Sequence, residues 1–178
     1  EGADDISGGV GDDYIDGGLG ADDISGGAGD DVIDGGSEGD VITAGSGDDT
    51  VYGSSGDDII AGGVGDDYID GGMDADVITA GDGDDTVFGA EGADDISGGA
   101  GDDTIDGGLD DDYIVGGSGD DTITGGEGQD VVEFLGSMAG FTVAAAADGT
   151  LTVTDTTTME GTDVVSGVER LRFSDGEL

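Results

Sequence analysis

Residues 8–16 read GGVGDDYID, residues 17–25 read GGLGADDIS and residues 26–34 read GGAGDDVID. The same nine-residue register continues to residue 133, which makes fourteen nonapeptides, and residues 1–7 (EGADDIS) are the last seven residues of a fifteenth. A fixed period of this kind is the signature of a repeat architecture in which each unit packs on the next. Because the chain begins inside a repeat, we expect it to be part of a longer protein.

Two positions of the nonapeptide never change in kind. The eighth position is always Ile or Val, from Ile6 to Val132. The sixth position is always Asp, at Asp4, Asp13, Asp22, Asp31, Asp40, Asp49, Asp58, Asp67, Asp76, Asp85, Asp94, Asp103, Asp112, Asp121 and Asp130.

The nonapeptide predicts one turn followed by one short strand. Positions one to six are rich in Gly and Asp, which tolerate tight turns and positive φ. Positions seven to nine place one apolar residue between two variable ones, which predicts a three-residue strand with its middle side chain inward. Two nonapeptides then form one flattened coil, and residues eighteen apart stack at about 4.8 Å. The predicted fold of residues 1–133 is all-β, a parallel β-roll: a two-sheet β-solenoid with 18 residues per coil.

This coiling would stack the sixth-position aspartates in two columns with thirteen stacked pairs. Two bare carboxylates about 4.8 Å apart repel by roughly 3 kcal/mol at an effective dielectric near 20. Thirteen such pairs would exceed the roughly 5–15 kcal/mol that keeps a domain folded, so we expect cations between the turns. Carboxylates and turn carbonyls are hard oxygen ligands, which favour Ca²⁺ over Zn²⁺ and over the strictly octahedral Mg²⁺. The prediction is multiple Ca²⁺ ions, about 13 at most, bound by the fifteen sixth-position aspartates.

Turn capping is the alternative role for these aspartates, but a cap would accept Asn and Ser as well as Asp. The unbroken row of Asp therefore favours metal ligation. For the fifth-position acids, such as Asp12, Asp30, Asp48 and Asp66, we expect turn capping or solvent exposure instead.

The repeat GG-x-G-x-D-x-U-x, where U is Ile or Val, resembles the nonapeptide of the RTX (repeats-in-toxin) calcium-binding family, the haemolysin-type β-roll. The resemblance covers residues 1–133. It implies a parallel β-roll that is disordered without calcium and folded with it. It also implies export by the type I secretion machinery of a Gram-negative bacterium, so that the protein is secreted or displayed at the cell surface, where calcium is plentiful.

Three repeats carry an acidic residue at position four, where most have Gly: Glu38, Asp74 and Asp110. Their backbone would have to adopt a conformation that favours Gly. Such a residue either weakens a calcium site at its turn or adds a ligand to it.

Composition excludes several classes of function. The formal net charge is −44, and Arg170 and Arg172 are the only basic residues, so we expect no nucleic-acid partner. No apolar run is long enough for membrane insertion. His and Cys are absent, which removes the usual general base and the common triads. Regular ladders of identical acids are typical of scaffolding, so we predict that the chain is not an enzyme and has no catalytic residues.

The outward strand positions suggest a second class of function. Thr50, Thr86, Thr104 and Thr122 share one face, with Tyr52 and Phe88 beside them. Regular Thr on a flat sheet is compatible with an adhesive, ice-binding or glycan-binding surface, but Thr is also common on exposed strands, and we favour that simpler explanation. A third possibility is that the chain is the C-terminal part of a secreted enzyme whose catalytic domain lies outside these residues.

The nine-residue period stops after Glu133. Residues 141–155 (FTVAAAADGTLTVTD) predict a β-hairpin, and residues 167–176 (GVERLRFSDG) predict a strand and a turn. Because the last coil of a solenoid exposes an apolar edge, residues 134–178 are predicted to be a C-terminal β cap. The expected function of the whole is a calcium-binding module that folds on Ca²⁺ binding outside the cell and stiffens a larger secreted protein.

Overall fold

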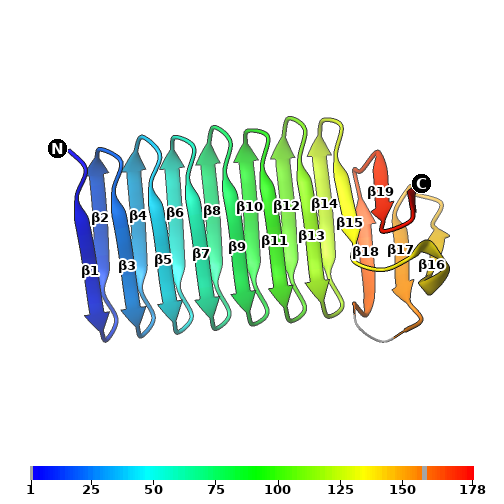
Figure 1. Ribbon diagram of the computed structural model, residues 1–178, viewed down its shortest axis with the longest axis horizontal. Coiled ribbons are helices and arrows are strands. Elements are labelled where there is room, and N and C mark those ends of the chain that lie inside the picture. The colour runs from blue at the N-terminus through cyan, green and yellow to red at the C-terminus, as the bar shows by residue number, and fades with distance from the viewer. Residues whose placement is uncertain (1, 158–159) are drawn as a thin grey trace.

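The computed structural model describes residues 2–157 and 160–178; Glu1, which falls in the predicted roll, and Thr158 and Met159, which fall in the predicted cap, lie outside the described residues. The chain forms two ten-stranded sheets that face each other along one long axis (Figure 1). Successive strands of the repeat region alternate between the two sheets, so each coil contributes one strand to each. The predicted parallel β-roll is confirmed.

The first sheet holds the odd-numbered strands of the roll and the last two strands of the chain: β1 (Asp5–Val10), β3 (Asp23–Ala28), β5 (Val41–Ser46), β7 (Ile59–Val64), β9 (Val77–Asp82), β11 (Asp95–Ala100), β13 (Tyr113–Ser118), β15 (Val131–Phe134), β19 (Arg170–Phe173) and β20 (Gly176–Glu177).

The second sheet holds the even-numbered strands of the roll and three later strands: β2 (Tyr14–Leu19), β4 (Val32–Ser37), β6 (Thr50–Ser55), β8 (Tyr68–Met73), β10 (Thr86–Glu91), β12 (Thr104–Leu109), β14 (Thr122–Glu127), β18 (Thr162–Ser166), β17 (Leu151–Asp155) and β16 (Phe141–Ala145).

The register between coils is eighteen residues, as the period predicts. Ile6 pairs with Ile24 in the first sheet, and Ile15 pairs with Ile33 in the second. The strands of the roll are longer than predicted, however: up to β14 they are six residues each rather than three. They run on through positions one to three of the next nonapeptide, because the glycines there let the backbone bend and still pair with the neighbouring coil.

The core lies between the sheets and consists mainly of the eighth-position side chains. From Ile24 to Val132 each of these is at most 2 % exposed. Their neighbours at positions seven and nine face outward and are exposed or half-buried, except Val131, which is 5 % exposed. Burying this row of Ile and Val is the main apolar contribution to the stack, at roughly 1.5–3 kcal/mol for each side chain.

After β15 the chain leaves the parallel coil, and it returns to it at β18 and β19. The segment between β15 and β18 is called the excursion. β16 and β17 form the predicted antiparallel hairpin, with Val143 opposite Val153, and β17 pairs antiparallel with β18. β18 then pairs parallel with β14, and β19 pairs parallel with β15. These C-terminal elements cover one end of the roll (Figure 1).

Three phenylalanines anchor the excursion to that end. The ring centroids of Phe134, Phe141 and Phe173 lie 5.2–5.5 Å from one another. Phe134 and Phe173 are each 3 % exposed and belong to the same core as the Ile and Val rows. A short 3₁₀-helix (Met138–Gly140) leads into the hairpin. In the described part of the chain, no helix has the length and apolarity that a membrane span requires.

Candidate metal centre

The sixth-position aspartates lie in the turns that connect the two sheets, one column along each edge of the roll. Thirteen of the fifteen, from Asp22 to Asp130, are at most 3 % exposed. Asp4 and Asp13, in the first coil of the described chain, are more exposed. A column of buried acids is a costly arrangement unless each carboxylate has partners.

A hydrogen-bond ladder runs through each column. The backbone N–H of each aspartate from Asp4 to Asp112 donates to Oδ1 of the aspartate eighteen residues later, at 2.7–3.0 Å. Such a bond exists for every one of the thirteen predicted stacked pairs, so the structure brings together all fifteen residues predicted from the sequence. One carboxylate oxygen of each pair is thereby satisfied.

The other carboxylate oxygen is not. In fourteen of the fifteen aspartates, all but Asp4, Oδ2 is buried and has no hydrogen-bond partner among the described residues. A buried charged oxygen without a partner costs at least about 1–3 kcal/mol. A row of such atoms, repeated at every coil, indicates a missing positively charged partner.

A backbone carbonyl of the next coil faces the same small space. A Cβ built on Gly35 would lie 2.6 Å from Oδ2 of Asp40 and 3.0 Å from the carbonyl oxygen of Gly53. Position one is therefore Gly in most repeats because the carboxylate and the carbonyl leave little room for a side chain there. Ala44 and Ala80 are exceptions, and their methyl groups are fully buried.

Burial and mutual repulsion shift the pKa values of the ladder. Burial is the largest cause, the charges of nearby aspartates add to it, and the hydrogen bond from the backbone N–H opposes it. Together they raise the pKa to about 6 at Asp58, Asp85 and Asp121, and to about 7 at Asp67, Asp76, Asp103 and Asp112. Without a cation, the ladder would hold protons near neutral pH.

The donor set fits calcium. Each gap between coils offers carboxylate and carbonyl oxygens only, which are the ligands that Ca²⁺ takes in its flexible coordination shell. Within the described ranges, no three carboxylate side chains converge on one point. An ion in this ladder would thus take two carboxylates per gap and complete its shell with backbone oxygens or water.

The sequence-based prediction missed two acids that continue the ladder. The N–H of Asp121 donates to Oδ1 of Asp163 at 3.0 Å, and the N–H of Asp130 donates to Oε2 of Glu169 at 2.9 Å. The signal was present in the sequence: residues 161–166 (GTDVVS) and 167–172 (GVERLR) each match positions four to nine of the nonapeptide. It was overlooked because residues 134–160 break the period and because Glu replaces Asp at residue 169.

The three acids at position four adopt the backbone conformation that Gly usually takes there. Their φ angles are 69° at Glu38, 77° at Asp74 and 76° at Asp110. Glu38 also uses its carboxylate, because Oε2 accepts the N–H of Gly20 at 2.9 Å. These turns therefore keep the fold of the others.

The fifth-position acids lie on the outside of the turns. Oδ1 of Asp12, Asp30 and Asp48 each accepts the N–H of the residue eighteen positions later, at 2.9–3.1 Å. The same bonds continue along this edge to Asp120, which accepts the N–H of Thr162 at 2.7 Å. Unlike the sixth-position acids, these residues are exposed to solvent.

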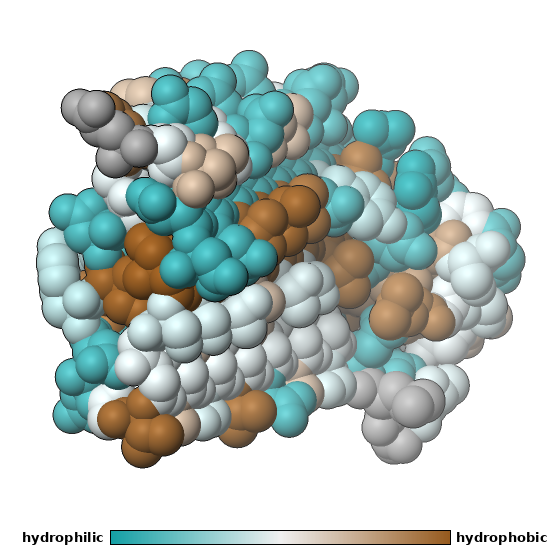
Figure 2. All heavy atoms as spheres, turned by 60° about the vertical axis from the view of Figure 1, so that its left-hand side comes forward, coloured by the Kyte–Doolittle hydropathy of each residue, from teal (hydrophilic) through white to brown (hydrophobic). Residues whose placement is uncertain are grey.

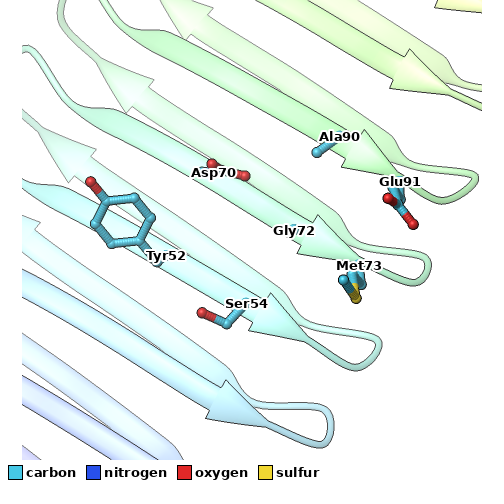
Figure 3. A pocket seen from close by; sticks show the side chains of 7 residues that line it. All are labelled: Tyr52, Ser54, Asp70, Gly72, Met73, Ala90 and Glu91. Carbon is cyan, nitrogen blue, oxygen red and sulfur yellow. The ribbon is translucent and has the colours of Figure 1, made fainter.

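The outer face of the second sheet carries aromatic residues. Tyr68 lies between Tyr52 and Phe88, with ring centroids 6.0 and 5.7 Å away. Beside them is an open hollow of about 310 Å³ lined by Tyr52, Asp70, Met73 and Glu91, among others (Figure 3). Seen from the N-terminal end, residues of like hydropathy line up in rows along the roll (Figure 2).

The repeats match a known family. The RTX calcium-binding nonapeptide repeat matches four times in succession, over residues 1–33, 34–69, 70–105 and 106–134. A search of curated proteins finds no match to the chain.

Proposed function

This chain belongs to the RTX calcium-binding nonapeptide-repeat family, and from that premise we propose that its calcium-binding β-roll is a module that folds when calcium binds. One observation carries the proposal: fourteen buried Oδ2 atoms have no hydrogen-bond partner in the part of the chain that the structure describes. At pH 8, above their raised pKa values, these carboxylates repel one another in the absence of a cation, and calcium between the coils turns that repulsion into attraction.

We place this folding outside the cell. Free calcium is scarce inside the cell, so the chain would stay unfolded there. Outside the cell calcium is abundant and would favour the folded roll. A chain that stays unfolded until it meets calcium suits export through the narrow channel of a type I secretion system. Once folded, the module would serve as a stiff part of a larger secreted protein rather than as a catalyst.

The test is circular dichroism of the chain against free calcium, with magnesium as the matched control. We expect a disordered spectrum in excess chelator, a β-rich spectrum with calcium, and little change with magnesium. A β-rich spectrum in excess chelator at pH 8 would refute the proposal, as would equal folding by magnesium.

A surface-binding role is the second candidate, favoured by the aromatic row Tyr52–Tyr68–Phe88 and the hollow beside it. Aromatic rings next to carboxylates suit the stacking and hydrogen bonding of a sugar ring. A glycan array probed with the calcium-loaded chain tests this role. Binding should be lost in Tyr52→Ala and Phe88→Ala, and an array without any bound sugar would exclude it.

A further inference from the structure

We propose that Asp163 and Glu169 close two further calcium sites, one at the end of each aspartate column, and that these ions fasten the C-terminal cap to the roll. The inference rests on the proposed calcium binding of the ladder and extends it beyond residue 134, where the family match ends. Both acids lie outside the nonapeptides.

The first argument is the continuity of the ladder. Asp163 accepts the N–H of Asp121, and Glu169 accepts the N–H of Asp130, in the same way as each aspartate of the roll accepts the N–H one coil below. The bonded residues are 42 and 39 apart in sequence instead of 18. The chain thus leaves the roll, forms the hairpin, and returns to the position that the next coil would occupy.

The second argument concerns the two junctions between the roll and the cap, Asp121–Asp163 and Asp130–Glu169. Within the described chain, each has an unpartnered oxygen on its roll side. Oδ2 of Asp121 and Oδ2 of Asp130 are buried without a hydrogen-bond partner among the described residues. The two residues are 1 % and 0 % exposed, respectively. They are therefore in the same condition as the aspartates inside the roll, although no further nonapeptide stacks on either of them in its column.

The third argument is that the glycine and the carbonyl of a regular gap recur at the end of the roll. A Cβ on Gly125 would lie 2.7 Å from Oδ2 of Asp130 and would also collide with the carbonyl oxygen of Gly167. This reproduces the arrangement of Gly35, Asp40 and Gly53. The Asp130–Glu169 junction thus offers the donor set of a regular gap: two carboxylates and one carbonyl from the next coil.

The Asp121–Asp163 junction has an additional acid nearby. Asp163 is 2 % exposed and Glu160 is 9 % exposed. Burial is the largest cause that raises the pKa of Asp163, and the negative charges of Asp121 and Glu160 add to it, so that the pKa is about 7. Oε1 of Glu160 accepts the N–H of Leu135 at 2.7 Å, which ties this acid to the start of the excursion.

Calcium at these two junctions would couple the cap to the roll. β18 and β19 pair with the last strands of the roll through only three and four residue pairs, respectively. An ion in each junction would add a link between residues that are far apart in sequence. The cap would then fold only when calcium is bound.

Native mass spectrometry, which resolves single bound ions, tests the proposal. Each regular gap and each junction should hold one ion, so the wild-type chain should saturate at about fifteen Ca²⁺. Asp163→Asn and Glu169→Gln should each lose one ion, because each acid is the last in its column and borders only one gap. Both variants keep the oxygen that accepts the backbone hydrogen bond, so a purely structural role predicts an unchanged count.

Three comparisons complete the experiment. Asp148→Asn, in the exposed turn of the hairpin, should keep the wild-type count, as should Asp163→Glu and Glu169→Asp, which retain the carboxylate. Hydrogen exchange across residues 141–155 should be faster in Asp163→Asn and Glu169→Gln than in wild type at the same calcium concentration.

A wild-type count near thirteen, or an unchanged count in both charge-removing variants, overturns the inference but leaves the proposed function standing. A chain that binds no calcium overturns both.

Discussion

Removing one carboxylate from the middle of a column is expected to have opposite effects with and without calcium. Asp103 is 1 % exposed and lies between Asp85 and Asp121 in its column. Asp103→Asn keeps an oxygen for the N–H of Asp85 but removes the negative charge from two gaps. The substitution therefore tests whether the ladder is a set of metal ligands or a set of turn caps.

The expected magnitudes follow from the two gaps. A bound ion at one hundred times its dissociation constant stabilises the fold by about 2.7 kcal/mol, so losing two ions costs up to roughly 5 kcal/mol. Without calcium, each pair of ionised carboxylates about 4.8 Å apart repels by roughly 3 kcal/mol. Removing the charge of Asp103 therefore favours the calcium-free fold by up to roughly 6 kcal/mol at pH 8.

The assay is circular dichroism at pH 8 in two series. In the first, Asp103→Asn should need a higher free calcium concentration than wild type to fold. In the second, with chelator present and sodium sulfate added to drive burial, it should fold at a lower sulfate concentration than wild type. The matched control is Asp102→Asn in the same turn, which is exposed and whose Oδ1 accepts the N–H of Asp120. If the two variants respond alike in both series, the metal-ligand assignment is wrong.

The ladder leads to three further predictions. Because burial raises the pKa of these carboxyls from 3.8 to about 6–7, the folded calcium-free chain holds more protons than the unfolded chain between these values. The stabilisation that these extra protons give the fold should be fully present below about pH 4 and lost as the pH rises through 6 to 7. Circular dichroism in chelator should therefore show β structure on acidification. No gain of β structure would contradict this prediction. In parallel, calcium uptake should weaken at pH 5 and should release protons at pH 7, as a pH-stat titration can measure. Gly35→Ala places a methyl against Oδ2 of Asp40 and the carbonyl of Gly53 and should destabilise the calcium-loaded fold by about 1–3 kcal/mol. Urea denaturation in calcium measures this, with Gly140→Ala, which has room for a Cβ, as the control; equal midpoints would show that the space at position one is not tight.

Much of the roll follows from the sequence because its interactions repeat at a short, constant separation. Once Ile15 is known to lie inward, the period of nine places every eighth-position residue, and the coil of eighteen residues places every sixth-position aspartate above another. The strand length was predicted too short, since pairing through Gly-rich positions depends on the neighbouring coil and not on local propensity.

The number of calcium ions and the division into a roll of residues 1–133 and a cap of residues 134–178 stay predictions. The structure adds that parallel pairing continues through β18 and β19, on the far side of the hairpin. These strands are adjacent to β14 and β15 in space but are separated from them by the excursion.

The sequence by itself therefore determined the repeat, the inward row of Ile and Val, and the two columns of acids with their preference for a hard cation. Only the tertiary structure decided that the backbone satisfies one oxygen of each carboxylate from Asp22 to Asp130 and leaves the other without a hydrogen-bond partner among the described residues. It alone also revealed that Asp163 and Glu169 complete the columns. The reason is physical: a periodic pattern specifies contacts between neighbouring coils, whereas contacts closed across a long loop depend on how the whole chain packs.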